Sequence, residues 1–177
     1  GAVELTLLDN VTLADSNENI ALLSALAIEG LAADGIDVLK STDPVLSLTV
    51  AQYEALGTVE LVDADYVELD DTSANLEAMS DTLIAGLTAK GIDGIRADDA
   101  TLNFSVSQAT ALNAVTILGT AVVSVVDSGA AIGAMTDTEI TALTGAGFDA
   151  IDADNDILTL DLAQFVVIGS VTLTGGD

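Results

Sequence analysis

The fold is decided by a stretch that the chain repeats, which in residues 59–114 reads VELVDADYVELDDTSANLEAMSDTLIAGLTAKGIDGIRADDATLNFSVSQATALNA. The same pattern occurs once directly before this stretch and once directly after it, with no inserted or deleted residue. Copies therefore span residues 3–58, 59–114 and 115–170, and a fourth begins at 171–177. The aligned positions include Val3, Val59 and Val115; Ile28, Ile84 and Ile140; and Gly35, Gly91 and Gly147. A fixed period of this length is typical of repeat proteins, whose units pack on their neighbours. We therefore expect residues 1–177 to form a single repeat array.

The first half of a copy predicts two strands followed by two helices. In the second copy, apolar residues alternate along 59–61 and 66–69, which is typical of two short strands. The pair Asp71-Thr72 then offers a side-chain oxygen that can cap the first helix. Ser80 begins the second helix, and Gly91 is expected to end it in the left-handed conformation.

The second half of a copy predicts one more strand and a brief helix. Residues 92–95 are extended and lead into an Asp-rich turn, after which apolar residues alternate along 102–106. Ser105 can then cap a short helix that contains Gln108. One unit is thus expected to run strand, strand, helix, helix, strand, short helix.

These units predict an α/β fold, an elongated repeat solenoid of three 56-residue coils. Packed helices lie about 8–10 Å apart and adjacent strands about 4.8 Å apart. Two neighbouring strands of one continuous sheet would therefore match the width of one helix layer. The alternative is a string of compact α+β modules. The copies follow one another without a linker, which argues against that alternative.

Composition and charge weigh against several classes of function. The chain has 29 acidic residues against three basic ones, a formal net charge of −26, so nucleic acid and anionic membrane surfaces are not expected partners. No apolar run approaches the ~18 residues of a membrane-spanning helix, and we expect no membrane insertion. The chain has no His and no Cys, the residues on which acid–base catalysis and metal catalysis most often depend. We therefore expect a protein that is not an enzyme.

One turn has the composition of a calcium site. Asp152, Asp154 and Asp156 alternate along it, and carboxylate oxygens are the ligands that Ca²⁺ prefers. The aligned turns, 96–100 and 40–44, do not keep this pattern. A solvated turn is the favoured interpretation, and bound calcium remains the alternative. Arg96 occupies the same repeat position as Asp152, so the two are also expected to form an exposed ion pair across successive coils, worth about 0–1 kcal/mol.

Three further sets of polar residues recur in all copies. They are Asp15, Asp71 and Asp127; Asp37, Asp93 and Asp149; and Gln52, Gln108 and Gln164. The first set is expected to cap helices and the second to accept hydrogen bonds from turn backbone. The glutamines are expected to form an internal side-chain ladder that satisfies backbone groups at the sheet edge. A glycan-binding row is the alternative for the glutamines.

The segments 11–16, 46–52 and 151–164 resemble repeats of very large bacterial surface and secreted proteins, including RTX-type adhesins and haemolysin-type calcium-binding proteins. The resemblance extends over essentially the whole chain at the level of pattern. It implies an extracellular or cell-surface location, a role as stalk or matrix material, and calcium-dependent folding. The glycine-rich nonapeptide of RTX calcium rolls is missing from this sequence, so calcium binding by that mechanism is not carried over.

These observations together favour a non-enzymatic extracellular structural repeat, a spacer or self-associating segment of a large adhesin-like or surface-layer protein. The expected partners are further copies of the chain, end to end, or neighbouring repeats, because stacked units leave an apolar face at each end. The alternative is a calcium- or ligand-binding module of a secreted protein.

Overall fold

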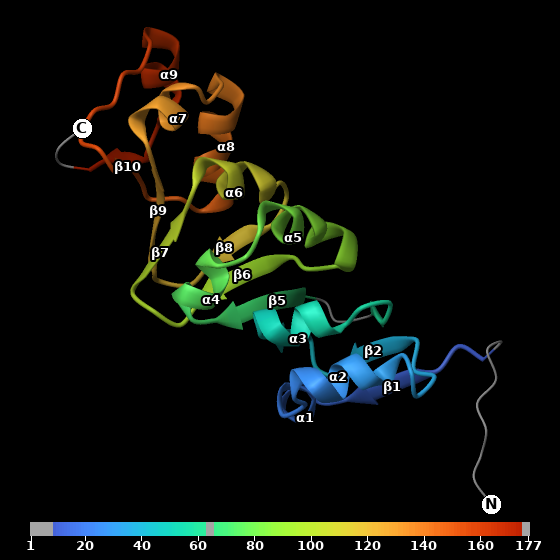
Figure 1. Ribbon diagram of the computed structural model, residues 1–177. Helices are drawn as coiled ribbons and strands as arrows, with labels where there is room; N and C mark the ends of the chain where they lie inside the picture. The colour runs from blue at the N-terminus through green and yellow to red at the C-terminus, as the bar shows by residue number, and fades with distance from the viewer. Residues whose placement is uncertain (1–8, 63–65, 175–177) are drawn as a thin grey trace, which may run out of the picture.

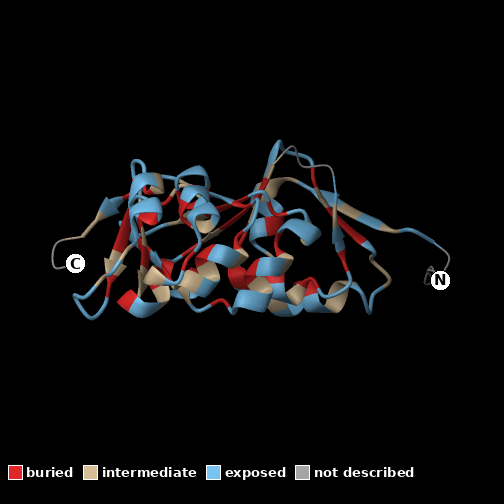
Figure 2. Ribbon diagram, turned by 90° about the horizontal axis from the view of Figure 1, so that it is seen from above, coloured by how far each residue is buried: buried red, intermediate tan, exposed pale blue. Residues whose placement is uncertain are grey.

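The computed structural model describes residues 9–62 and 66–174, which form an elongated α/β protein with its two ends far apart (Figures 1 and 2). In chain order it begins with β1 (Thr12–Asp15), α1 (Asn17–Ala21), α2 (Ala25–Leu31), β2 (Val38–Ser41), β3 (Val45–Leu48), α3 (Val50–Ala55) and β4 (Glu60–Leu61). It continues with β5 (Tyr66–Asp71), α4 (Ser73–Glu77), α5 (Asp81–Gly86), the 3-10 helix η1 (Thr88–Lys90), β6 (Gly94–Ala97), β7 (Thr101–Phe104), α6 (Val106–Ala111) and β8 (Thr116–Leu118). It ends with β9 (Val122–Asp127), α7 (Gly129–Gly133), α8 (Asp137–Ala146), β10 (Ala150–Ala153), α9 (Leu162–Val167) and β11 (Thr172–Leu173).

The strands form three parallel sheets. Their strand orders are β1-β2-β4, β3-β5-β6-β8 and β7-β9-β10-β11. The second sheet takes β3 from the first copy, β5 and β6 from the second, and β8 from the third. The third sheet is built in the same way, one copy further along. Each copy therefore contributes strands to its neighbours' sheets, and the copies interlock.

The helices pack on one another and on the sheets beside them. The third helix of a copy contacts both the second helix of that copy, as α2 contacts α3, and the first long strand of the next copy, as α3 contacts β5. The buried aliphatic side chains form one cluster that extends from Ile20 to Val171. Buried segments accordingly follow the interior along the length of the molecule in Figure 2. The core is thus shared by the copies.

The helix boundaries follow from capping residues in the sequence. Thr72 and Ser80 cap α4 and α5 through their side-chain oxygens, as predicted for the start of each helix. Ser105 and Gln108 form a capping box on α6, in which each side chain accepts a hydrogen bond from the other's backbone N–H. Gly91 ends η1 with a φ of 81°, in the left-handed region. The predicted helix starts are therefore confirmed, whereas the helix that Ser80 begins already ends at Gly86 and Gly91 ends only the 3-10 helix that follows it.

The α/β class is confirmed, but two expectations about the strands are wrong. Residues 94–97, expected only to be extended, form β6, so the second copy has four strands instead of three. The strands of successive copies also do not align in one continuous sheet, because the two strands at the start of a copy separate into different sheets, as β4 and β5 do. Among the helices of the described ranges, none has the length and apolar character needed to cross a membrane.

Candidate functional site

The feature that the structure repeats most faithfully is the junction between one copy and the next. At the first junction β3 pairs with β5 in parallel, and Val45 lies opposite Tyr66. At the second junction β7 pairs with β9, and Thr101 lies opposite Val122. The two registers are related by a shift of one repeat length. The junction is therefore a defined interface that occurs twice in the described chain.

An aspartate at the end of a strand accepts a hydrogen bond across each junction. Asp71 Oδ2 accepts a hydrogen bond of 3.0 Å from the backbone N–H of Val50 in the preceding copy. Asp127 Oδ2 accepts the equivalent bond of 3.1 Å from Val106. The other oxygen of Asp71 accepts from the Thr72 N–H at 2.8 Å. The expectation that these aspartates are the caps is corrected here: the helix N-caps are the residues that follow them, Ser16, Thr72 and Ser128.

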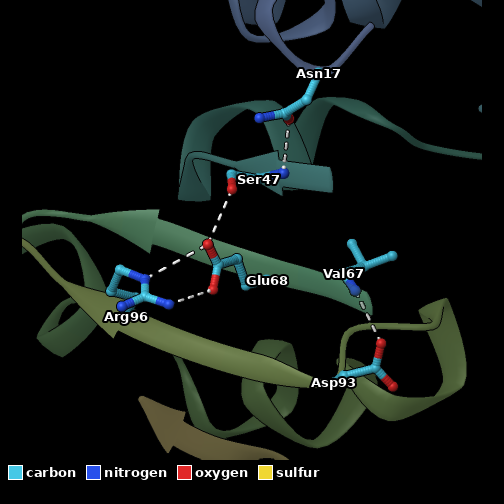
Figure 3. Close-up of polar contacts among 6 residues, drawn as sticks. All are labelled: Asn17, Ser47, Val67, Glu68, Asp93 and Arg96. Carbon is cyan, nitrogen blue, oxygen red and sulfur yellow. Dashed lines mark hydrogen bonds and ion pairs between the residues drawn. The ribbon is translucent and has the colours of Figure 1, made fainter. Parts of the chain in front are cut away.

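A polar chain of contacts crosses the first junction (Figure 3). Asn17 Oδ1 accepts from the Ser47 N–H at 2.9 Å, and Ser47 Oγ donates to Glu68 Oε1 at 2.9 Å. Arg96 then pairs with Glu68, its Nη2 lying 3.1 Å from Oε2. Glu68 is buried while Arg96 remains partly exposed. A buried carboxylate is thus neutralised by a cation on the neighbouring strand.

This contact corrects the prediction that Arg96 pairs with Asp152. The two residues lie on β6 and β10, which belong to different sheets. Sequence reasoning missed the Glu68–Arg96 pair, although a signal was present. Only the second copy combines a Glu at this strand position with an Arg at the position of Arg96.

Asp70 on β5 carries a buried, unsatisfied oxygen. Within the described residues its Oδ1 has no hydrogen-bond partner. Burial raises the pKa of the Asp70 carboxyl, and the negative charges of Asp98 and Glu68 raise it further, whereas Arg96 lowers it. The group is therefore a local weakness of the second sheet at neutral pH.

The glutamines have a structural role, as expected, but with different partners. Gln52 Oε1 accepts from the Thr49 N–H at 2.8 Å, and its Nε2 donates to the carbonyl oxygens of Ala21 and Leu23 at 3.2 and 2.8 Å. Gln108 and Gln164 make the equivalent contacts in their copies. Each glutamine thus joins the third helix of its copy to the connection between the first two. The side chains do not form a ladder with one another, and the groups they satisfy are not at a sheet edge.

The aspartates after the glycine turns bind backbone at the start of a distant strand, and not the turn backbone that was predicted. Asp93 Oδ2 accepts a 2.9 Å bond from the N–H of Val67, 26 residues earlier (Figure 3). Asp37 and Asp149 accept the equivalent bonds from Val11 and Val123. These aspartates therefore recur because each one joins the segment after the second helix to the start of the strand that precedes the helices in the same copy.

The predicted calcium ligands lie at the end of β10 and in the turn after it. Asp152 is half-buried on β10, and its Oδ1 accepts a 2.6 Å hydrogen bond from Thr174 Oγ1. Asp154 and Asp156 are exposed, and Asp156 has a φ of 53°. Within the described ranges the structure brings no three acidic side chains together in a group able to hold a metal ion. Calcium at this turn stays a prediction.

A small cavity of about 180 Å³ lies at the second junction, between α6 and α8. Its lining includes Ala109, Thr110 and Thr138. At the first junction the position of Ala109 is taken by Tyr53, which is buried and reaches Gly86 on α5. The cavity therefore arises where alanine replaces tyrosine in the same interface, and packing alone accounts for it.

No protein-family model matches the chain, and no curated protein matches it.

Proposed function

We propose that the chain is a non-enzymatic structural repeat of the cell exterior, a spacer or self-associating segment of a large adhesin-like or surface-layer protein. The polar residues that recur in the copies support this role. Asp71 binds the backbone of the preceding copy, whereas Gln52 and Asp93 bind distant backbone within their own copies, so these recurring side chains serve to hold the fold. Such a pattern suits a protein whose task is to keep a shape.

The single observation that carries the proposal is the exchange of strands between copies. Because β3 belongs to the sheet of the next copy, a unit cannot move away from its neighbour without breaking a parallel strand pair. Each added copy would extend the array by a further sheet with its helices. In this sense the copies 3–58, 59–114 and 115–170 are the coils of an elongated solenoid.

The spacer role is tested by the distribution of distances along the molecule. Spin labels at Ala14 on β1 and Thr172 on β11 should give one narrow distance distribution in a pulsed dipolar measurement. A broad distribution would mean that the copies move independently, and the spacer role would then be wrong. Labels at Ala14 and Glu54, both exposed and within one copy, provide the control for the spread that the labels themselves contribute.

The location is tested on the organism that makes the protein. An antibody against the chain should bind intact cells, and protease treatment of those cells should remove the signal. If the signal appears only after the cells are broken, the surface role is overturned.

Calcium binding is the second candidate, and one observation favours it: Asp154 and Asp156 are both exposed on a turn whose alternating aspartates the aligned turns 40–44 and 96–100 do not keep. Isothermal titration should show calcium binding to the wild type and none to a variant with Asp154→Asn and Asp156→Asn. An identical titration for both proteins, or no heat for either, would remove this candidate.

A further inference from the structure

We infer that the two ends of the array bind one another, so that a second copy of the chain docks head to tail by adding one strand to an open sheet. Residues 157–160 of one molecule would pair with β1 of the next. This inference rests on the proposed self-associating role and specifies its partner, register and residues.

The pattern of strands at the two ends is the first observation. At the internal junctions, residues 45–48 and 101–104 are the strands β3 and β7, whereas the equivalent residues 157–160 form no strand. At the other end, β1 has four residues, whereas its equivalents β5 and β9 have six. The first residues of β5 and β9 pair with β3 and β7 respectively. Within residues 9–62 and 66–174, the strand pair of the internal junctions therefore has only one of its two members at each end, and the two ends hold complementary members.

Residues 157–160 are already held in place. A Cβ at Gly129 on α7 would overlap the carbonyl oxygen of Ile157, and one at Gly133 would lie 2.7 Å from that of Thr159. The two glycines let residues 157–160 rest directly on α7. At the internal junction the residue equivalent to Gly129 is Ser73, which donates a hydrogen bond to the Thr101 carbonyl. The segment is therefore positioned before a partner arrives, which lowers the entropic cost of strand addition.

Exposed apolar side chains concentrate on the two end faces. On the C-terminal face the exposed fractions are 68% for Ile157, 79% for Leu162, 63% for Phe165 and 70% for Val166; on the N-terminal face they are 80% for Leu22 and 77% for Leu26. Of the nine large exposed apolar residues in the described chain, these make up six. Apolar surface that is grouped in this way marks an interaction site.

The identities of these residues match across the proposed contact. At the first internal junction, Glu54 and Ala78 line one groove, and at the second, Thr110 and Thr138 line the cavity. In the contact between ends, the equivalent repeat positions hold Val166 in place of Glu54 or Thr110, and Leu22 and Leu26 of a second copy in place of Ala78 and Thr138. All three positions become more apolar together, and the two leucines are also larger than the residues they replace. The contact between ends would thus bury more apolar surface than either internal junction at these positions.

An aromatic residue and a glycine complete the match. Tyr53 fits over Gly86, where its hydroxyl would lie 3.6 Å from an added Cβ. The corresponding pair across the ends is Phe165 with Gly30 of the second copy. Gly30 has no atom within 4 Å of the position of a Cβ, so the space is open. Phe165 would fill it as Tyr53 fills the internal junction.

The register follows from the internal junctions. Thr159 would lie opposite Thr12 of the second copy, as Ser47 lies opposite Glu68. Asp15 of the second copy would accept the N–H of Leu162, as Asp71 accepts that of Val50.

Cysteine cross-linking tests the register, because the chain has no Cys of its own. Thr159→Cys protein mixed with Thr12→Cys protein should form a disulfide-linked heterodimer under mild oxidation, since paired strands bring Cα atoms within disulfide range. The control mixture is Thr159→Cys with Thr172→Cys, whose cysteine is exposed on β11. Equal cross-linking in both mixtures, or none in the first, would overturn the inference.

Sedimentation velocity over a range of concentrations tests the energetics. The wild type should form species larger than the monomer, and Val166→Glu, which copies the residue of the first junction, should weaken the association about tenfold or more. Phe165→Ala, which copies the second junction, should also weaken it. Val45→Thr, which copies Thr101, is the control and should leave association unchanged. Because each variant copies a residue that the fold already accepts, circular dichroism should show all of them folded.

A wild type that stays monomeric at every concentration would overturn the inference even if the distance and surface-labelling experiments support the spacer role. Conversely, association in this register with a broad distance distribution would support the docking while removing the spacer role. The two proposals can therefore fail separately.

Discussion

The Asp71 carboxylate at the end of β5 accepts a hydrogen bond of 3.0 Å from the backbone N–H of Val50, the first residue of α3 in the preceding copy. The same carboxylate also accepts from Thr72 and Asn75 in its own copy. One buried side chain therefore satisfies the start of a helix on each side of a junction. Charge-assisted bonds of this kind are stronger than neutral ones.

Replacing Asp71 by alanine should lower the free energy of unfolding by about 2–4 kcal/mol, because buried N–H groups lose their acceptor. Urea denaturation followed by circular dichroism measures the loss. The control is Asp15→Ala, which changes the same repeat position where the residue is exposed. Its loss should be smaller by at least about 1 kcal/mol. Equal losses for the two variants would show that the bond to Val50 contributes nothing.

Replacing Arg96 by alanine should destabilise the protein by about 2 kcal/mol, because Glu68 is then left buried without its cation. The double variant with Glu68→Gln as well should recover part of this loss, since no unpaired charge remains. Lys40→Ala is the matched control, because Thr12 stands at the position of Glu68 in the first copy. Thermal unfolding of the wild type, Arg96→Ala, Glu68→Gln and the double variant measures the coupling, and additive effects would contradict it.

Asp70→Asn should raise the melting temperature at pH 7. Burial raises the pKa of Asp70 in the folded protein above its ordinary 3.8, so the folded state holds this proton more tightly than the unfolded chain does. Protonation therefore favours folding, and the carboxyl destabilises the protein increasingly as the pH rises through its raised pKa. The advantage of the variant should vanish at about pH 3, where Asp70 is protonated in both states.

The control for this experiment is Asp34→Asn. It replaces an exposed carboxylate and makes the net charge less negative by the same amount. If Asp34→Asn gives the same gain with the same dependence on pH, the effect comes from general repulsion in a chain of net charge −26 and not from Asp70.

Ala109→Tyr should stabilise the second junction by about 1 kcal/mol, because the tyrosine fills the cavity beside α8 as Tyr53 fills the equivalent space beside α5. The reverse change, Tyr53→Ala, should cost about 3 kcal/mol. Chemical denaturation measures both. A destabilised Ala109→Tyr protein would show that Ala142, which stands where α5 has Gly86, does not leave room for the ring.

The local structure could be predicted because its causes lie within a few residues. Thr72 and Ser80 cap helices through bonds to backbone N–H groups three positions later, and Gly91 ends a helix because it adopts a positive φ at no steric cost. The Glu68–Arg96 pair and the bond from Val50 to Asp71 join residues 28 and 21 positions apart. Their formation depends on which strands become neighbours, and no short-range pattern specifies that.

The sequence by itself determined the length of the repeat, the α/β class and the residues that begin and end the helices, because these depend on periodic apolar positions and on capping groups close in the chain. Only the tertiary structure decided that β3 pairs with a strand of the following copy and β4 with a strand of the preceding copy. A parallel strand shows the same apolar alternation whichever neighbour it joins. The choice is made by long-range packing, where Tyr53, Gly86 and the junction aspartates favour exchange between copies over closure within one.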